Sequence, residues 1–168
     1  MTDSVIVFDT ETTGLSPRYG HRIIEIGAVK LSGETIVDEF HSLIDAGVVI
    51  SPQAQAVHGI SRAMLRGQPR PEEVFFDFHN FIGQSLLVAH NAPFDLRFLR
   101  AEFGLLGFGL ANQVECTLKL SRKYLSDLSN YRLETVYRHL GGVVDDSVQR
   151  HRALDDARMA AFVWLGLQ

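Results

Sequence analysis

Cysteine is nearly absent from this sequence. Its 168 residues include one, Cys116, so no internal disulfide can form and no cysteine cluster can hold zinc or an iron–sulfur group. A bound metal would therefore need oxygen or histidine ligands. Cys116 ends an apolar run, and we expect it to be a small core residue.

Long hydrophobic runs are also absent. No apolar stretch approaches the length of a bilayer span, and Met1-Thr-Asp-Ser4 lacks the basic start and long apolar stretch of a secretion signal. We therefore expect a cytoplasmic protein. With 46% hydrophobic residues, the chain can close one sizeable core but not two, so we expect a single domain over residues 1–168.

An excess of basic charge is the third absence. The net charge of −4 argues against capture of nucleic acid by overall electrostatics. The charge is uneven, because residues 1–60 carry three basic and eight acidic side chains, whereas residues 117–158 carry eight basic and six acidic ones. Two divalent cations bound to carboxylates would bring the net charge to about zero, so a metal-loaded protein need not repel phosphate.

The most informative stretch that is present is the opening run, Val5-Ile-Val-Phe-Asp-Thr-Glu-Thr-Thr-Gly14. Its β-branched start predicts a buried strand, and side chains alternate along a strand, so Asp9 and Glu11 share a face that Thr10 does not. Two adjacent like charges at the end of a buried strand are costly without a compensating cation. Taken alone, such a pair is better explained as surface carboxylates in a turn.

The rest of the chain predicts alternating strands and helices. Ile23–Leu31 and Thr35–Ile44 read as strands of an antiparallel meander with the opening strand. Residues 51–67 mix short helical pieces with Val57-His-Gly-Ile60, which we expect to be a loop. Further on we expect a helix from Pro71, strands over Leu86–Ala89 and Gln113–Cys116, helices over Leu118–Leu125 and Tyr131–Leu140, a polar connection over Val143–Arg150, and a last helix from His151.

Asp95 follows one of these strand ends, in the first turn of a predicted helix. The end of a strand that passes into a helix is where α/β folds place ligands. By itself, Asp95 could also be an acid that stabilises the helix macrodipole.

Asp156 lies on the apolar stripe of the last helix, whereas its neighbour Asp155 is turned away and should be solvated. A carboxylate on such a stripe needs compensation, and an ion pair with Arg152 or Arg97 is the alternative to a metal. His151, one to two turns earlier, could swing over the same site or be an ordinary helix-start residue. The stripe consists of Ala153, Asp156, Ala157, Ala160, Ala161 and Trp164.

Together these groups indicate metal chemistry. Acidic oxygen donors without cysteine suit hard cations such as Mg²⁺ or Mn²⁺, and two such ions about 3.5–4 Å apart stabilise an in-line phosphoryl displacement. His151, with a reference pKa near 6.5, is the candidate general base. Each carboxylate has an alternative explanation of its own, and all of these would have to hold at once if no metal were bound. We therefore interpret Asp9, Glu11, Asp95 and Asp156 as metal ligands.

Three stretches closely resemble, in order and spacing, the motifs of the DEDDh family of 3′-to-5′ exonucleases, which includes the proofreading ε subunit of bacterial DNA polymerase III. They are Phe8-Asp-Thr-Glu-Thr-Thr-Gly-Leu15, His90-Asn-Ala-Pro-Phe-Asp95 and His151-Arg-Ala-Leu-Asp-Asp-Ala157. Val57-His-Gly-Ile60 is similar to an intermediate element of the family. The resemblance extends from Val5 to about Val163.

The resemblance implies an RNase H-like α/β fold with a mixed five-stranded sheet in the order 3-2-1-4-5 and helices on both faces. It implies two Mg²⁺ (or Mn²⁺) ions held around Asp9, Glu11, Asp95 and Asp156, with Asp9 bridging both and His151 as the base. It also implies that the terminal nucleotides contact five further residues: Thr12, Leu15, His58, Asn91 and Phe94.

We therefore expect a metal-dependent 3′-to-5′ exonuclease that releases nucleoside 5′-monophosphates from a single-stranded or frayed 3′ end, with DNA favoured over RNA. An RNA-trimming exoribonuclease of the same family is one alternative. A module that binds nucleic acid or a polymerase without cutting is the other, although a pure binder gains nothing from crowding carboxylates where phosphate must approach. A polymerase, or further domains beyond Gln168, are candidate partners.

Overall fold

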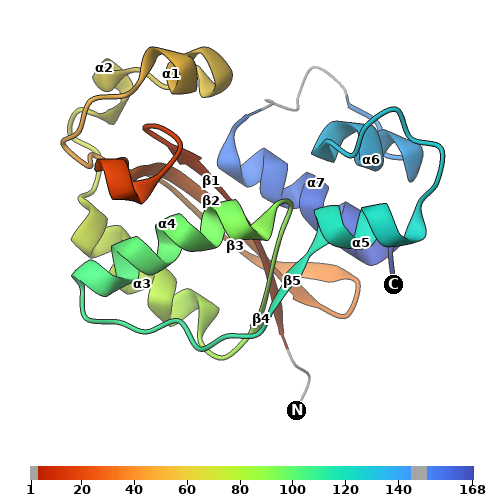
Figure 1. Cartoon of the computed structure of the whole chain (residues 1–168). Helices are drawn as coiled ribbons and strands as arrows, with labels where there is room; N and C mark the ends of the chain where they lie inside the picture. The colour runs from red at the N-terminus through yellow and green to blue at the C-terminus, as the bar shows by residue number, and fades with distance from the viewer. Residues whose placement is uncertain (1–3, 145–150) are drawn as a thin grey trace.

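A five-stranded sheet forms the centre of the computed structural model, which describes residues 4–144 and 151–168. The strands lie in the order β3-β2-β1-β4-β5, as predicted, with helices on both faces (Figure 1). The strands are β1 (Val5–Thr12), β2 (Ile23–Ser32), β3 (Thr35–Leu43), β4 (Leu86–Ala89) and β5 (Val114–Cys116).

The sheet is mixed because its connections differ in length. β1, β2 and β3 form an antiparallel meander with short connections, whereas β4 and β5 run parallel to β1 and are reached through helices, as parallel neighbours require. The helical elements are η1 (Pro17–Tyr19), α1 (Pro52–His58), α2 (Arg62–Leu65), α3 (Pro71–Ile82), α4 (Ala92–Leu105), α5 (Thr117–Tyr124), α6 (Leu133–His139) and α7 (Ala153–Gly166).

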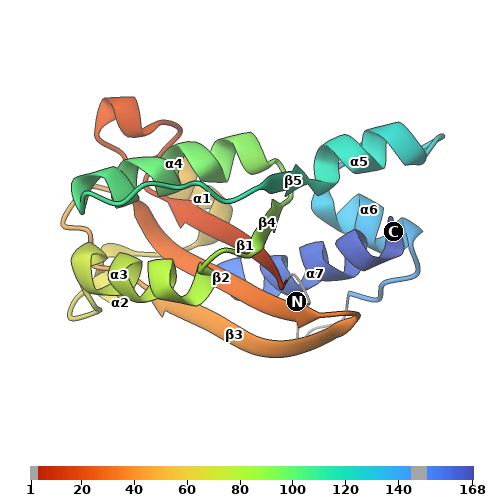
Figure 2. The ribbon, with the colours of Figure 1, turned by 90° about the horizontal axis from the view of Figure 1, so that it is seen from below.

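Alternate residues of β1 enter different cores. Ile6 and Phe8 pack with α3 and α4 on one face of the sheet, while Val7 packs with α7 on the other. Figure 2 shows the sheet between these helices. Because both faces are covered, β1 reads as a continuous apolar run until its carboxylates begin. Cys116 is buried in the α3–α4 core, as expected.

One local prediction is wrong. The stretch Val57-His-Gly-Ile60 was expected to be a loop, but Val57 and His58 are the last residues of α1, and only Gly59 and Ile60 lie outside a helix. The Ser51 hydroxyl accepts a hydrogen bond from the Ala54 N–H and Pro52 occupies the first turn, so the helix starts well. It ends only at Gly59, whose left-handed φ of 71° closes the C-terminus.

Smaller differences concern helix ends. The helix expected from Tyr131 begins at Leu133, and the last helix begins at Ala153, so His151 lies in the turn before it. Most of the polar connection expected over Val143–Arg150, and Met1-Thr-Asp3 at the start, fall outside the described residues. Within the ranges 4–144 and 151–168, no helix is both long and apolar enough to cross a membrane.

Candidate active site

The site lies at the carboxyl end of β1, where α4 and the turn before α7 approach it (Figure 1). Val7 faces α7, and by the alternation of a strand Asp9 and Glu11 face the same way. Thr10 points to the other face, where its hydroxyl and its backbone N–H both donate to Asp95 Oδ1, at 2.7 and 3.2 Å. Asp95 is thereby fixed in the first turn of α4.

Helix α7 brings Asp156 to the site because small residues let it approach the sheet. Ala153, Ala157 and Ala160 are fully or almost fully buried, and Gly27 of β2 lies so close that a Cβ there would come within 2.2 Å of the Leu154 nitrogen. Asp156 itself is buried.

Asp155 differs from its neighbour, but it is not simply solvated as expected. It is partly buried and accepts a hydrogen bond from Arg158 Nη1 at 2.9 Å. The helix thus turns one carboxylate toward the sheet and leaves the next in a surface ion pair.

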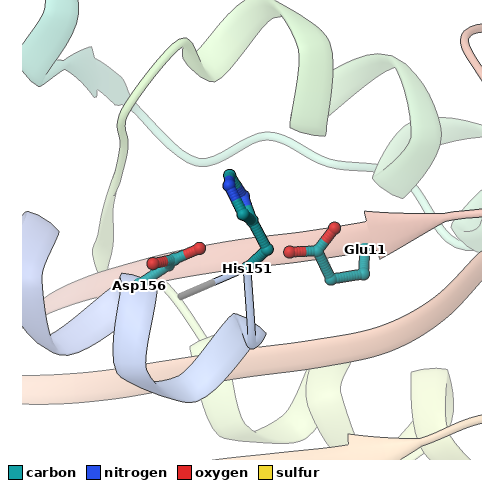
Figure 3. A group of neighbouring side chains, drawn as sticks. All are labelled: Glu11, His151 and Asp156. Carbon is teal, nitrogen blue, oxygen red and sulfur yellow. The ribbon is translucent and has the colours of Figure 1, made fainter. Parts of the chain in front are cut away.

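Glu11, His151 and Asp156 come together from three segments of the chain. One ligand atom of each lies within 4.8 Å of the other two, and Figure 3 shows the two carboxylates turned toward each other with His151 projecting between them. His151 is exposed and adopts a left-handed φ of 55°, and its backbone N–H bonds to the Asp156 carboxylate. Among the described residues, these three side chains form the group that could hold a metal ion.

The two other predicted ligands lie beside the triplet. Asp9 lines the same cavity as His151 and Asp156, and the charges of Asp95 and Asp156 act on it. Asp95 also acts by charge on Glu11. All four predicted carboxylates therefore share one electrostatic environment.

Burial and mutual repulsion disfavour the ionised forms of these carboxyl groups. Burial, followed by the charges of Asp95, Asp156 and other carboxylates, raises the pKa of Asp9 well above its ordinary value. Burial and the charge of Asp156 raise the pKa of Glu11 to about 9. Burial raises the pKa values of Asp95 and Asp156 to about 7 each, although hydrogen bonds from Thr10 and from the His151 backbone act in the opposite direction.

The two arginines considered as ion-pair partners of Asp156 contact other groups. Arg152 directs its guanidinium to Glu25, with Nη2 at 2.9 Å from Oε1, and Arg97 lies over the Phe94 ring at 5.6 Å from its centroid. The excess negative charge and the oxygen-rich donor set fit a hard divalent cation. The residues present therefore suit the metal ions that the motifs imply.

The five residues expected to contact nucleotides differ in exposure. Leu15 is 79% exposed, Asn91 is exposed with a left-handed φ of 72°, and Phe94 is partly buried. Thr12 is buried, and its hydroxyl donates to the Gly14 carbonyl. His58 is also buried.

Both ring nitrogens of His58 are used within the protein. Nε2 donates to the Thr12 carbonyl at 3.1 Å and Nδ1 accepts from the Ile60 N–H at 3.0 Å. This pattern requires the neutral imidazole, and burial lowers its pKa accordingly. His58 thus fixes the backbone of the segment that carries Thr12.

A cavity of about 730 Å³ extends from Asp9 and Asp156 toward α5 and α6. Its far side includes Arg122 and Arg132, neither of which was identified from the sequence. Both are exposed, and no carboxylate pairs with either guanidinium among the residues that the structure describes. The basic excess over residues 117–158 was the available signal, but it could not say which arginines face the site.

His90 holds this side of the cavity in place. Its Nε2 donates to the Tyr131 carbonyl and its Nδ1 accepts from the Thr117 hydroxyl, both at 2.9 Å. The end of β4 is thereby tied to α5 and to the segment before α6. Burial lowers the pKa of His90, which keeps the ring neutral in this role.

The sequence is similar to those of known exonucleases and DNA polymerase III proteins. The sequence profile of the RNase T family, described as exonuclease, matches residues 6–163. The chain is 42% identical over 159 residues to the PolC-type DNA polymerase III of Clostridium perfringens, covering 95% of this chain and 11% of that protein. It is 39% identical over 170 residues to the DNA polymerase III subunit epsilon of Rickettsia conorii, covering 96% of this chain and 72% of that one.

The fold has matching solved structures. Exonuclease X in complex with 5′ overhanging duplex DNA superimposes with a TM-score of 0.79 at 31% sequence identity, covering 97% of this chain and 90% of that one. This agrees with the RNase H-like arrangement of the sheet. The chain spans about a tenth of the length of the PolC-type relatives that it matches.

Proposed function

Since this chain belongs to the RNase T family of exonucleases, we propose that it hydrolyses phosphodiester bonds from the 3′ end of a single-stranded or frayed strand and releases nucleoside 5′-monophosphates. One observation carries the proposal: Glu11, His151 and Asp156 meet within 4.8 Å. They do so beside a cavity of about 730 Å³ that Asp9 also lines.

Two Mg²⁺ or Mn²⁺ ions are the proposed cofactors. Asp9, Glu11, Asp95 and Asp156 would hold them, because these carboxylates repel one another in a buried setting that favours bound cations. Bound there, the ions would neutralise charge on the attacking and leaving oxygens and make water more acidic. Thr10 orients Asp95 for this task through its two hydrogen bonds.

His151 is the proposed general base. Its ring is exposed beside Glu11 and Asp156, so it can take a proton from water next to the carboxylates and release it to solvent. Its backbone N–H is engaged with Asp156, which fixes the main chain from which the ring projects.

The substrate would contact residues on both sides of the carboxylates. The exposed apolar side chain of Leu15 and the ring of Phe94 offer surfaces for bases or sugars, and Asn91 offers polar contacts. Thr12 and His58 would shape the terminal nucleotide pocket, with His58 acting through the Thr12 backbone that it holds.

Arg122 and Arg132 would face the backbone phosphates. Their guanidinium groups line the same cavity as the carboxylates and have no carboxylate partner among the described residues. Local positive charge opposite the acidic site lets a polyanion approach a protein whose net charge is −4.

DNA is the favoured substrate. The named relatives are DNA polymerase III proteins, and the Exonuclease X structure contains DNA. We further propose that the chain acts as one exonuclease domain in the cytoplasm, in association with a polymerase or with further domains. The PolC-type relatives, in which the matching segment is a small part of a longer protein, support this.

The direct test is degradation of a 5′-labelled single-stranded DNA oligonucleotide with Mg²⁺, compared with RNA of the same length and sequence. Progressive shortening from the 3′ end and release of 5′-monophosphates are expected, with DNA cut faster. An oligonucleotide left intact under both Mg²⁺ and Mn²⁺ would contradict the proposal, and binding without cutting would favour the binding module. Faster RNA cleavage would favour an exoribonuclease.

The two adjacent aspartates of α7 provide a matched pair of variants. Asp156→Asn should lower kcat by at least about a hundredfold because it removes a proposed ligand. Asp155→Asn makes the same chemical change in a carboxylate paired with Arg158, and its kcat should stay within about twofold of the wild type. Equal losses in the two variants would argue against a specific role for Asp156.

A further inference from the structure

Glu25 is a fully buried carboxylate at the edge of the site. Its exposed fraction is 0%, and it stands directly opposite Glu11 in the β1–β2 ladder. Cross-strand partners share a face of the sheet, so Glu25 points toward α7 as Glu11 does. Its charge opposes ionisation of Asp9, Glu11 and Asp156, so placing it here has an electrostatic cost.

A role as a further metal ligand does not explain this position, because both carboxylate oxygens already have donors. Oε1 accepts from His41 Nε2 at 2.7 Å and from Arg152 Nη2 at 2.9 Å. Oε2 accepts from Arg152 Nε and from the Ala153 N–H, both at 3.2 Å. The bonds keep the pKa of Glu25 below its ordinary value despite burial, so the group is a carboxylate committed to other partners.

Besides His41, the partners of Glu25 are the N-cap and the first residue of α7. Arg152 is the N-cap residue of α7 and makes no side-chain cap bond. Its guanidinium instead forms a fork on Glu25 of β2, which is 127 residues away in sequence. Gly27, one step along the same face of β2, has the backbone of Ala153 and Leu154 against it. The start of α7 is therefore fixed on β2 by close packing at Gly27 and by charge at Glu25.

His151 depends on this anchor. Its ring is exposed, and its backbone has a left-handed φ of 55°, which is unfavourable for a residue with a Cβ. Such a conformation persists only when neighbouring structure imposes it. Two neighbours supply this structure: Arg152 follows His151 directly, and the Asp156 carboxylate bonds its backbone N–H. Both belong to the start of α7.

We propose that Glu25 is a positioning residue that, through Arg152 and the Ala153 N–H, anchors the start of α7 and holds the His151 ring beside Glu11 and Asp156. The inference rests on the proposed function, in which His151 acts as the base. It adds that the placement of this base is set from β2, by a residue that touches neither metal nor substrate.

The first test is Glu25→Gln in the full chain, assayed on the labelled single-stranded DNA. Gln keeps the shape and one acceptor but loses the charge and the second acceptor that the Arg152 fork requires. We expect kcat to fall by about 10- to 100-fold, as for a displacement of about 1 Å of a reacting group, while KM stays within about twofold.

A readout independent of activity follows His151 itself. In a ¹H–¹³C spectrum of the histidine rings, the His151 signal is identified by its loss in His151→Ala. We expect this signal to shift or broaden in Glu25→Gln in metal-free protein, because the ring loses its fixed placement. Failure of the wild type to cut DNA would remove the proposed function, and the spectrum would still decide whether Glu25 places His151.

Glu102→Gln is a closely matched control. Glu102 is also buried, accepts an arginine fork from Arg22 at 2.8 and 2.6 Å, and accepts the Ile23 N–H at 3.2 Å. It reproduces the arginine fork and the backbone N–H bond of Glu25, but its partners lie at the start of β2 and not at the start of α7. Glu102→Gln should lower the thermal midpoint but leave kcat and the His151 signal unchanged.

Three outcomes would overturn the proposal. They are a Glu25→Gln variant with wild-type kcat, equal losses of kcat in Glu25→Gln and Glu102→Gln, and an unmoved His151 signal. If Glu25→Gln fails to fold, Arg152→Lys serves, since lysine keeps the charge but cannot form the fork. It should reproduce the loss of kcat and the altered signal, and wild-type behaviour of both would equally overturn the inference.

Discussion

Thr10 and Asp95, which are 85 residues apart in sequence, are joined by two hydrogen bonds to the same carboxylate oxygen. The bonds join β1 to α4. They fix Asp95, a proposed metal ligand, on the strand that carries Asp9 and Glu11. Thr10 lies on the face opposite Asp9 and Glu11, so it orients Asp95 without pointing into the site itself. The alternation of the strand, which separates Thr10 from its neighbours, is what allows this support.

Removal of the Thr10 hydroxyl should weaken metal binding. Thr10→Val keeps the shape and the backbone N–H but loses the 2.7 Å hydrogen bond. That bond favours the ionised form of Asp95, because it lowers the pKa that burial raises. We expect the free energy of unfolding to fall by about 1–2 kcal/mol and the Mg²⁺ concentration at half-maximal activity to rise severalfold. Thr10→Ser restores the hydroxyl and should recover the Mg²⁺ dependence, and a lack of recovery would locate the defect in packing instead.

The metal-free protein should lose stability as pH rises from 7 to 9. Burial and the charge of Asp156 raise the pKa of Glu11 to about 9, so in this range the folded state keeps a proton that the unfolded chain has released. A folded state that binds more protons is destabilised as protons are withdrawn. His58 and His90, whose pKa values are lowered, are neutral in both states here and do not contribute.

Thermal midpoints in EDTA at pH 7, 8 and 9 would measure this effect, and Mg²⁺ should raise the midpoint most at pH 9, where the bare carboxylates repel one another most. Glu11→Gln should flatten the decline and be more stable than the wild type at pH 9 without metal. A constant wild-type midpoint over this range would show that the carboxylates do not hold protons as their burial implies.

Gly27 should tolerate no side chain. In Gly27→Ala the new Cβ would lie 2.2 Å from the Leu154 nitrogen, so α7 would have to move away from β2 and carry Asp156 with it. We expect a loss of about 1–3 kcal/mol in urea unfolding, together with reduced activity. Gly104→Ala, in α4 with no atom within 4 Å of the added Cβ, should be neutral or stabilising, and similar losses in both would contradict the close-packing argument.

Arg122 and Arg132 should set the salt dependence of substrate binding. In Arg122→Ala and Arg132→Ala we expect KM for single-stranded DNA to rise severalfold and the slope of log affinity against log salt to shrink by about 0.7 per arginine. Arg62→Ala, which removes a surface arginine paired with Asp45, should change neither. Slopes equal to that of the wild type would mean that the two arginines do not contact phosphate.

Local patterns in the sequence predicted much of this protein. The alternation along β1 predicts that Asp9 and Glu11 share a face, and the alanine stripe of α7 predicts which of two adjacent aspartates turns inward. The strands predicted from these patterns agree with the structure, and so does the strand order that the family resemblance implies. The loop expected around His58 was wrong because Ser51 and Pro52 start a helix that continues to His58 and is closed by Gly59. The prediction gave more weight to the glycine than to these helix-start signals.

Only the tertiary structure decided which distant groups meet. The fork between Arg152 and Glu25 and the placement of Arg122 and Arg132 around the cavity depend on contacts between segments tens of residues apart. Periodicity describes how one segment presents its faces, but it contains no information about which partner each face will meet. The sequence by itself thus determined the chemical groups of the site, and folding determined their distances, their protonation and the residues that hold them in place.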